Sequence, residues 1–323
     1  MSNLNDFVIE NGVLKKYVGQ DENVVVPESV LQVGDRAFFG CENILTVELP
    51  KNISKIGWAA FRDCKKLIKI NLPEKLESIN GDAFDQCCNL ADINIPESVT
   101  VIEYGAFRGC KSIINVKIPD NIKKLDWGTF SGCSSLEEIV LPGGLIEINC
   151  CFGSCKKLKE VHIPQSVKII GDNTFGNCDS LTEITLPYNL ESVGKDTFKG
   201  CSKELLIHCS GKIFKQFSKE TKDNLSVLWM MGEDSFEQEQ ISAMKKYIGR
   251  VGGRLLNFIK GDNIDALTKF LSCIKLNLDV LDDFINIYND GEHPGMLLTL
   301  IGCKNKMKTV SNLDQKTEEE FVL

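Results

Sequence analysis

The sequence predicts an α+β protein, a solenoid of about eight coils of 23 residues with a parallel concave sheet, followed by a small all-α domain. Two regularities predict the solenoid, because a fixed period of this length is typical of stacked repeats. First, eight of the nine prolines recur at steps of 23 residues, with one step of 22: Pro27, Pro50, Pro73, Pro96, Pro119, Pro142, Pro164 and Pro187. Second, a Phe-x2-Cys element keeps the same step, with phenylalanines at Phe38, Phe61, Phe84, Phe107, Phe130, Phe152, Phe175 and Phe198.

Each coil carries the apolar pattern of a short strand followed by a turn. In residues 64–84 the apolar positions Leu67, Ile70 and Leu72 have the Leu-x2-Ile-x-Leu spacing of a leucine-rich repeat, whose alternating part is a strand. The proline that follows has no N–H group and ends the strand. Burying about six such side chains stabilises a coil by about 10–18 kcal/mol. Ordering its residues costs about 1.5 kcal/mol each, so a single coil should not fold and the coils must stack.

Eight of the fourteen cysteines occupy one position of the repeat, three residues after the phenylalanine. We expect these thiols to be small buried hydrophobic groups under the next coil, and Cys64, Cys110 and Cys133 to be buried free thiols. Redox sensing or disulfides between neighbouring coils are the alternative. No Cys-x2-Cys pair is followed by a second one, so the sequence predicts no metal site, and it predicts no cofactor.

On these residues the repeats resemble the BspA-like, or Treponema-type, leucine-rich repeats, a bacterial subfamily. Residues 7–19, FVIENGVLKKYVG, are similar to the hairpin that caps the first coil, and residues 205–230 to the cap that closes the last. The resemblance covers about residues 1–230. It implies a protein-interaction scaffold, often surface-exposed or secreted. The coil that ends at Phe152 departs from the pattern, because one residue is missing before this phenylalanine.

The bulk composition excludes several classes of partner. A formal net charge of −8 provides no broad basic field for nucleic acid. No stretch of about 18 apolar residues predicts a membrane span. The first residues carry neither the positive nor the apolar region of a signal peptide, so we expect a cytoplasmic protein. The motifs of common enzyme sites are missing, and the sequence therefore predicts no catalytic residues.

Two rows of side chains are the predicted partner-binding surfaces. The first lies on the strands, where Glu138, Glu160 and Glu183 would stand in adjacent coils with His162 beside them and could receive a basic peptide. A solvated polar face is the alternative interpretation. His162 and His208 should lie about 10 Å apart, which is too far for one metal ion.

The second row lies three residues before each phenylalanine and contains Trp58, Tyr104 and Trp127. Large aromatic side chains on a surface are typical of binding hot spots. In the alternative interpretation the rings fold back over neighbouring coils, with Gly81 leaving room for one of them.

After Met231 the 23-residue step gives way to helical periodicity. Helices are predicted after Ser235 and near residues 253–260, 263–273, 279–289 and 294–303, a helical domain with an ankyrin-like internal similarity. The chain is predicted to have five parts: a capping hairpin (1–26), leucine-rich repeats (27–204), the cap of the solenoid (205–232), the helical domain (233–305) and a disordered acidic tail (306–323).

These features favour a non-catalytic protein-protein interaction scaffold that acts inside the cell. A surface-exposed or secreted adhesin-like protein is the alternative, and an enzyme is a third class. The expected partner is a protein or peptide of basic character, and self-association is the other arrangement that the exposed aromatic row allows. We expect neither nucleic-acid binding nor membrane insertion.

Overall fold

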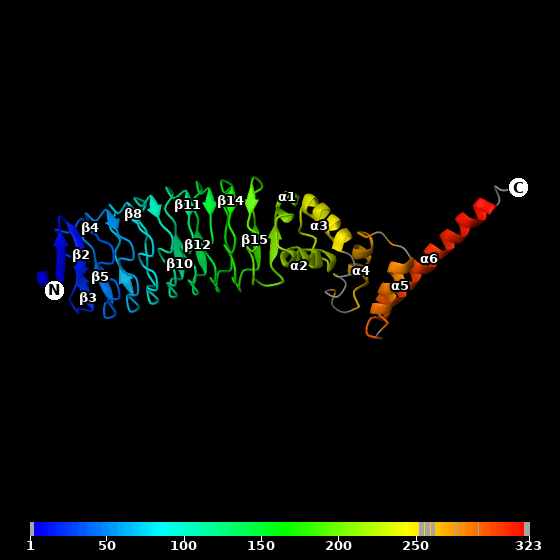
Figure 1. Ribbon diagram of the computed structural model, residues 1–323, viewed down its shortest axis with the longest axis horizontal. Coiled ribbons are helices and arrows are strands. Elements are labelled where there is room, and N and C mark those ends of the chain that lie inside the picture. Colours follow the sequence, from blue (N-terminus) through cyan, green and yellow to red (C-terminus); the bar gives the residue numbers. More distant parts are fainter. Residues whose placement is uncertain are drawn as a thin grey trace. The chain divides into compact units, whose positions relative to one another are not determined.

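The computed structural model describes residues 3–251, 255, 259, 262–274, 276, 278–289 and 291–319, with side chains in the last helix up to residue 308 (Figure 1). The chain forms two compact units. The first consists of residues 1–209 and 216–221, and the second of residues 210–215 and 222–323.

The first unit begins with a short 3-10 helix, η1 (Leu4–Asp6), and an antiparallel hairpin of β1 (Phe7–Glu10) and β2 (Val13–Tyr17). Asn11 and Gly12 form its turn with φ angles of 49° and 76°. A two-residue turn with positive φ at both positions matches the twist of the strands that it joins. The hairpin then presents β2 to β4 (Gln32–Val33), which pairs with it in parallel and starts the stack of coils.

The coils contribute strand segments to two faces of the solenoid. The first strand face is formed by the strands of the Leu-x2-Ile-x-Leu pattern. It contains β3 (Asn23–Val25), β5 (Thr46–Glu48), β7 (Lys69–Ile70), β10 (Asn115–Lys117), β12 (Glu138–Val140), β15 (Glu183–Thr185) and β17 (Leu206–His208). The second strand face contains β4, β6 (Lys55–Ile56), β8 (Ser78–Ile79), β9 (Val101–Ile102), β11 (Lys124–Leu125), β13 (Glu147–Ile148), β14 (Ile169–Ile170) and β16 (Ser192–Val193). The predicted solenoid with parallel sheets is therefore confirmed (Figure 1).

The register of the strands follows the period of the sequence. Asn115 lies opposite Glu138, a step of 23 residues, whereas Glu147 lies opposite Ile169, a step of 22 across the shortened coil. Parallel strands in register place equivalent residues of successive coils side by side, so every repeated position becomes a column along the solenoid.

The core of the first unit is a column of eight stacked phenylalanine rings. Their centroids lie 4.7–6.1 Å apart with interplanar angles of 2–16°. All eight side chains are buried. The widest spacing, 6.1 Å, separates Phe130 from Phe152, where the coil is one residue short.

The eight cysteines at the repeated position, called here the ladder cysteines, pack beside the rings as free thiols. Cys64, Cys110 and Cys133 are buried, and each Sγ donates to the backbone carbonyl of the phenylalanine 26 residues earlier at 3.0–3.3 Å. Burial raises the pKa of Cys133 to about 12 and that of Cys201 to about 11. A thiol with a raised pKa carries little thiolate at neutral pH and is a weak nucleophile. The geometry therefore favours buried, unreactive thiols over redox-active ones at these positions.

We expect thiol labelling of the native protein at pH 8 to leave Cys64, Cys110 and Cys133 unmodified. The partly exposed Cys88 and Cys303 provide the internal control and should react within the same period. In urea all fourteen cysteines should react, and mass spectrometry of the digested protein assigns the labels. Fast labelling of the ladder cysteines in the native protein would contradict their burial.

The second unit contains helices, as the sequence predicts. They are α1 (Gly211–Phe214), α2 (Lys219–Met230), α3 (Gln238–Val251), α4 (Ile264–Leu271), α5 (Leu278–Ile287) and α6 (Pro294–Glu319). The first residues of α2 belong to the first unit. The helix predicted near residues 253–260 lies mostly outside the described residues, and α6 continues past residue 306, the predicted start of the tail.

Two side chains accept hydrogen bonds from the first turns of α4 and α6. Asn263 caps α4 by accepting a hydrogen bond from the Ala266 N–H at 2.9 Å. The Asp262 carboxylate accepts from the N–H groups of Gly295 and Met296, both at 2.7 Å, and so places a negative charge at the first turn of α6. Among the helices that the structure describes, none has the length and apolar character that a membrane span requires.

Candidate protein-interaction surfaces

The acidic row lies on the first strand face as the sequence predicts. Glu138 and Glu183 belong to β12 and β15, and Glu160 lies on the coil between them. All three carboxylates are exposed, while their neighbours Ile139, Val161 and Ile184 are buried in the core. This alternation results from the strand period, which sends successive side chains to opposite sides.

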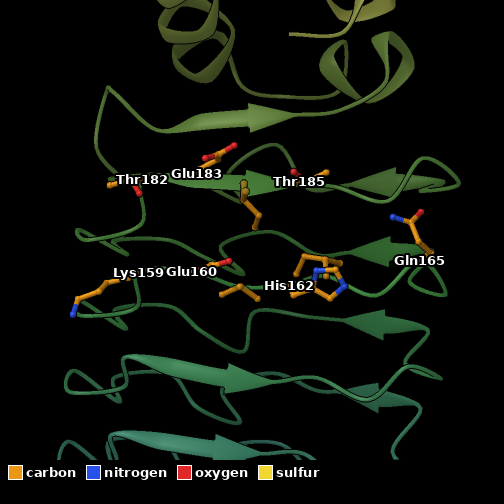
Figure 2. A pocket seen from close by; sticks show the side chains of 10 residues that line it. Lys159, Glu160, His162, Gln165, Thr182, Glu183 and Thr185 are labelled. Carbon is orange, nitrogen blue, oxygen red and sulfur yellow. The ribbon is translucent and has the colours of Figure 1, made fainter. Parts of the chain in front are cut away.

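A hollow of about 450 Å³ opens on this face between two coils (Figure 2). Figure 2 shows Glu160 and Glu183 above one another on successive coils, with His162 and Thr185 beside them. Further polar side chains that line the hollow are Lys159, Gln165 and Thr182. The structure therefore brings together three of the predicted residues, Glu160, His162 and Glu183, in one depression.

The hollow coincides with a break in the ladder of backbone hydrogen bonds. On the first strand face β10 pairs only with β12, and β15 only with β17. Within the described residues, no backbone hydrogen bond joins residues 160–163 to the coil before or after them. These residues lie in the coil that directly follows the shortened one. A second break, at residues 93–95, falls in a coil of ordinary length.

Some of the charged side chains around the hollow are in ion pairs and others are not. The Glu183 carboxylate lies 2.9 Å from Nε2 of His208, and Lys159 points to Glu137 with its Nζ 3.2 Å from Oε2. Over the residues that the structure describes, no cationic group lies within ion-pair distance of Glu138 or Glu160. Two exposed carboxylates are thus free to accept hydrogen bonds from a partner.

The histidines do not add a metal site to this surface. No group of three or more His, Cys, Asp or Glu side chains in the described part of the chain could hold a metal ion. The first strand face is also open to solvent at Glu138, Glu160 and His162. An open face cannot remove water from a reacting group, so the arrangement suits binding better than catalysis.

The aromatic row is partly covered by its own coils. The ring of Tyr104 lies against Gly81, where a Cβ atom would come within 2.8 Å of the ring. The guanidinium groups of Arg36 and Arg108 lie 5.6 and 5.4 Å from the rings of Trp58 and Trp127. Even so, 44% of Tyr104 and 53% of Trp127 stay exposed, whereas Trp58 is half-buried. The Tyr104 ring thus folds back over the preceding coil as in the alternative interpretation, and the row still presents aromatic surface.

A buried ionic cluster beside this row was not foreseen from the sequence. Asp85 is 1% exposed and binds Arg108 through two hydrogen bonds, at 3.0 Å from Nε and 2.7 Å from Nη2. Arg62 lies on the other side, with Nε 3.2 Å from the Asp85 carboxylate. The signal was present, because Arg62, Asp85 and Arg108 each follow a phenylalanine of the repeat at the 23-residue step.

A family model for the BspA type leucine rich repeat region, in six copies, matches residues 9–137 and 100–220. The chain belongs to this family. The match covers the coils, both strand faces and the acidic hollow. The resemblance that the repeats predict is therefore confirmed. No curated protein matches the sequence.

Solved structures of similar proteins agree with the family. A leucine rich repeat protein of T. pallidum is 30% identical, with a TM-score of 0.52 over 56% of this chain and 90% of its own. A leucine rich cell surface protein of Faecalibacterium prausnitzii is 23% identical, with a TM-score of 0.52 over 66% of this chain and 69% of its own. A leucine-rich repeat protein of Bacteroides ovatus is 23% identical, with a TM-score of 0.51 over 68% and 64%. The latter two show the shared fold.

Proposed function

We propose that this BspA-type repeat protein is a non-catalytic interaction scaffold inside the cell, and that its acidic hollow binds a basic segment of a protein partner. One observation carries the proposal: Glu160 and Glu183 stand in register in a hollow where the backbone ladder is interrupted. A lysine or arginine side chain that enters the hollow would donate charge-assisted hydrogen bonds to both carboxylates.

The interrupted ladder adds backbone groups to the same site. Residues 160–163 make no backbone hydrogen bond to either neighbouring coil in the described structure, so their N–H and C=O groups are available to a ligand or to water. A peptide backbone can use such groups in the way that strands are added to open sheet edges. Carboxylates then select basic side chains, and the backbone groups add affinity that does not depend on sequence.

The thiol column supports a reducing location. Cys64, Cys110 and Cys133 donate S–H hydrogen bonds to backbone carbonyls, a role that requires the reduced form. Reduced thiols persist in the cytosol, whereas secreted proteins form disulfides. The packing of these cysteines is therefore suited to a protein that works inside the cell.

Neutralising the hollow should weaken binding of a lysine- and arginine-rich peptide about tenfold, or about 1.4 kcal/mol. The test is fluorescence anisotropy of a labelled peptide with the Glu160→Gln/Glu183→Gln variant. Glu28→Gln/Glu74→Gln is the matched control, because both carboxylates are exposed on the same unit and lie on other coils. Its affinity should equal that of the parent protein, and the affinity of the parent should fall as salt is added.

Two outcomes would decide against the hollow. If both double variants bind the peptide equally well, the attraction belongs to the overall negative charge and not to this site. If Trp127→Asp abolishes binding while the hollow variant retains it, the aromatic row is the partner surface.

A further inference from the structure

The second unit contains a hollow of opposite character to the acidic one. It has a volume of about 610 Å³ and is lined by Phe214 and Lys215 at the end of α1, Lys222 on α2, and Ala243, Lys246 and Arg250 on α3. Four cationic side chains thus gather around one depression in a protein whose net charge is −8. The repeats take no part in it.

Close packing of α1 against α3 forms the floor of this basic hollow. A Cβ atom at Gly211 would lie 2.8 Å from the Glu239 carbonyl oxygen, so glycine is needed for this approach. The Phe214 ring meets the Tyr247 ring edge to face at 6.1 Å, and the Tyr247 hydroxyl donates to Asp223 at 2.6 Å. The hollow is therefore held by buried contacts and has an apolar floor.

Three of the four cations at its rim, Lys215, Lys246 and Arg250, have no acidic partner among the described residues, and two of them lie on α3. Ala243, Lys246 and Arg250 are spaced i, i+3 and i+7 and so lie on one face of α3. Within the described residues, no carboxylate lies within ion-pair distance of Lys215, Lys246 or Arg250, all of which are exposed. Lys222 has its Nζ 5.4 Å from the Tyr247 ring.

We propose that the basic hollow binds an acidic peptide segment of a partner protein, with a hydrophobic side chain of that segment on Phe214 and Ala243. Carboxylates of the segment would pair with Lys215, Lys246 and Arg250, whose positive charges are not paired with any carboxylate of the described residues. The apolar floor distinguishes this ligand from a free anion, because burying a hydrophobic side chain there gives affinity that salt does not screen. The helical unit thereby gains a binding role separate from that of the repeats.

A labelled peptide with the sequence of residues 315–323, QKTEEEFVL, has the required chemistry and serves as the probe. The full-length chain should bind it, and the Lys246→Glu/Arg250→Glu variant should bind it at least tenfold more weakly. Lys65→Glu/Lys66→Glu changes the net charge equally on exposed lysines of the first unit and should leave binding unchanged. Helix content measured by circular dichroism checks folding, and Lys246→Gln/Arg250→Gln provides a milder variant with the same expected direction.

The peptide itself supplies the second half of the test. QKTQQQFVL, without the charges, and QKTEEESGS, without the apolar residues, should both bind more weakly than the parent peptide. Equal binding of all three peptides, or equal binding by the two charge-reversal variants, would overturn the proposal. So would binding to phosphatidylserine vesicles with no binding of the acidic peptide. Affinity for the basic peptide at the acidic hollow should stay unchanged throughout, which separates this proposal from the first.

Discussion

Replacing Asp85 by alanine should lower the free energy of unfolding of the repeat unit by about 2–3 kcal/mol, because the partly buried Arg62 and Arg108 lose their nearest carboxylate and keep only longer contacts to Asp82. The Asp85 side chain is 1% exposed, and the side chains of Arg62 and Arg108 are only 33% and 26% exposed. Water can therefore replace the lost carboxylate only in part. The fork of two hydrogen bonds to Arg108 is lost together with the contact to Arg62.

Urea unfolding followed by tryptophan fluorescence measures this loss. A Trp229→Phe background restricts the signal to Trp58 and Trp127, which both lie in the first unit. Glu97→Ala is the control, because this carboxylate also pairs with a cation, Lys117, and is exposed to water. It should change stability far less, since water screens exposed ion pairs. Equal effects of the Asp85 and Glu97 variants would contradict a buried, unscreened cluster.

Asp82 of the same cluster should behave differently from Asp85. Burial raises its pKa in spite of the two arginines nearby, and its Oδ1 accepts no hydrogen bond. A carboxyl whose pKa is raised by folding binds its proton more tightly in the folded state. Its contribution to stability is therefore present at low pH and is lost as the pH rises through the raised pKa. Asp82→Asn should accordingly cost less than Asp85→Ala at neutral pH and should remove this part of the pH dependence.

The repeat could be predicted from the sequence because the residue type that recurs at a position indicates whether that position is buried. Phe107 and Cys110 recur with the period, and a position that is apolar in every coil must face the core. The cluster around Asp85 escaped this reasoning, because the position after the phenylalanine carries different residue types from coil to coil, such as Arg62, Asp85 and Arg108. Charged residues are usually exposed, and only the stacking of three coils makes this group buried.

Neither hollow could be predicted, because both arise from features that no local sequence pattern indicates. Val161 and Ile163 keep the apolar alternation of a strand, yet residues 160–163 make no backbone hydrogen bonds to the neighbouring coils in the described structure. The acidic row was predicted from its residues, whereas the depression between its coils was not. The basic hollow required α1 to dock on α3, and the residues at its floor, Phe214 and Ala243, are 29 positions apart. Such contacts arise from tertiary packing.

The ring column should also be sensitive to a single truncation. Phe107→Ala is expected to cost about 3–5 kcal/mol of unfolding free energy, because a fully buried ring leaves a cavity that the neighbouring coils cannot fill. Phe107 is fully buried, and the Phe84 and Phe130 rings both lie 5.3 Å away at angles of 5° and 7°. A collapse of one coil would break the parallel register on both strand faces, so the cavity should persist.

The same urea titration measures this loss, with two variants that separate its causes. Phe107→Leu keeps most of the apolar volume and should cost less than about 1.5 kcal/mol beyond the ring-stacking contribution of about 0.5–1.5 kcal/mol. Tyr188→Ala removes an aromatic ring that is 77% exposed and should leave stability nearly unchanged. If Phe107→Ala cost no more than Tyr188→Ala, the column would not be the core of the solenoid. A large loss for alanine with a small one for leucine would instead assign the stability of the coils to filled volume.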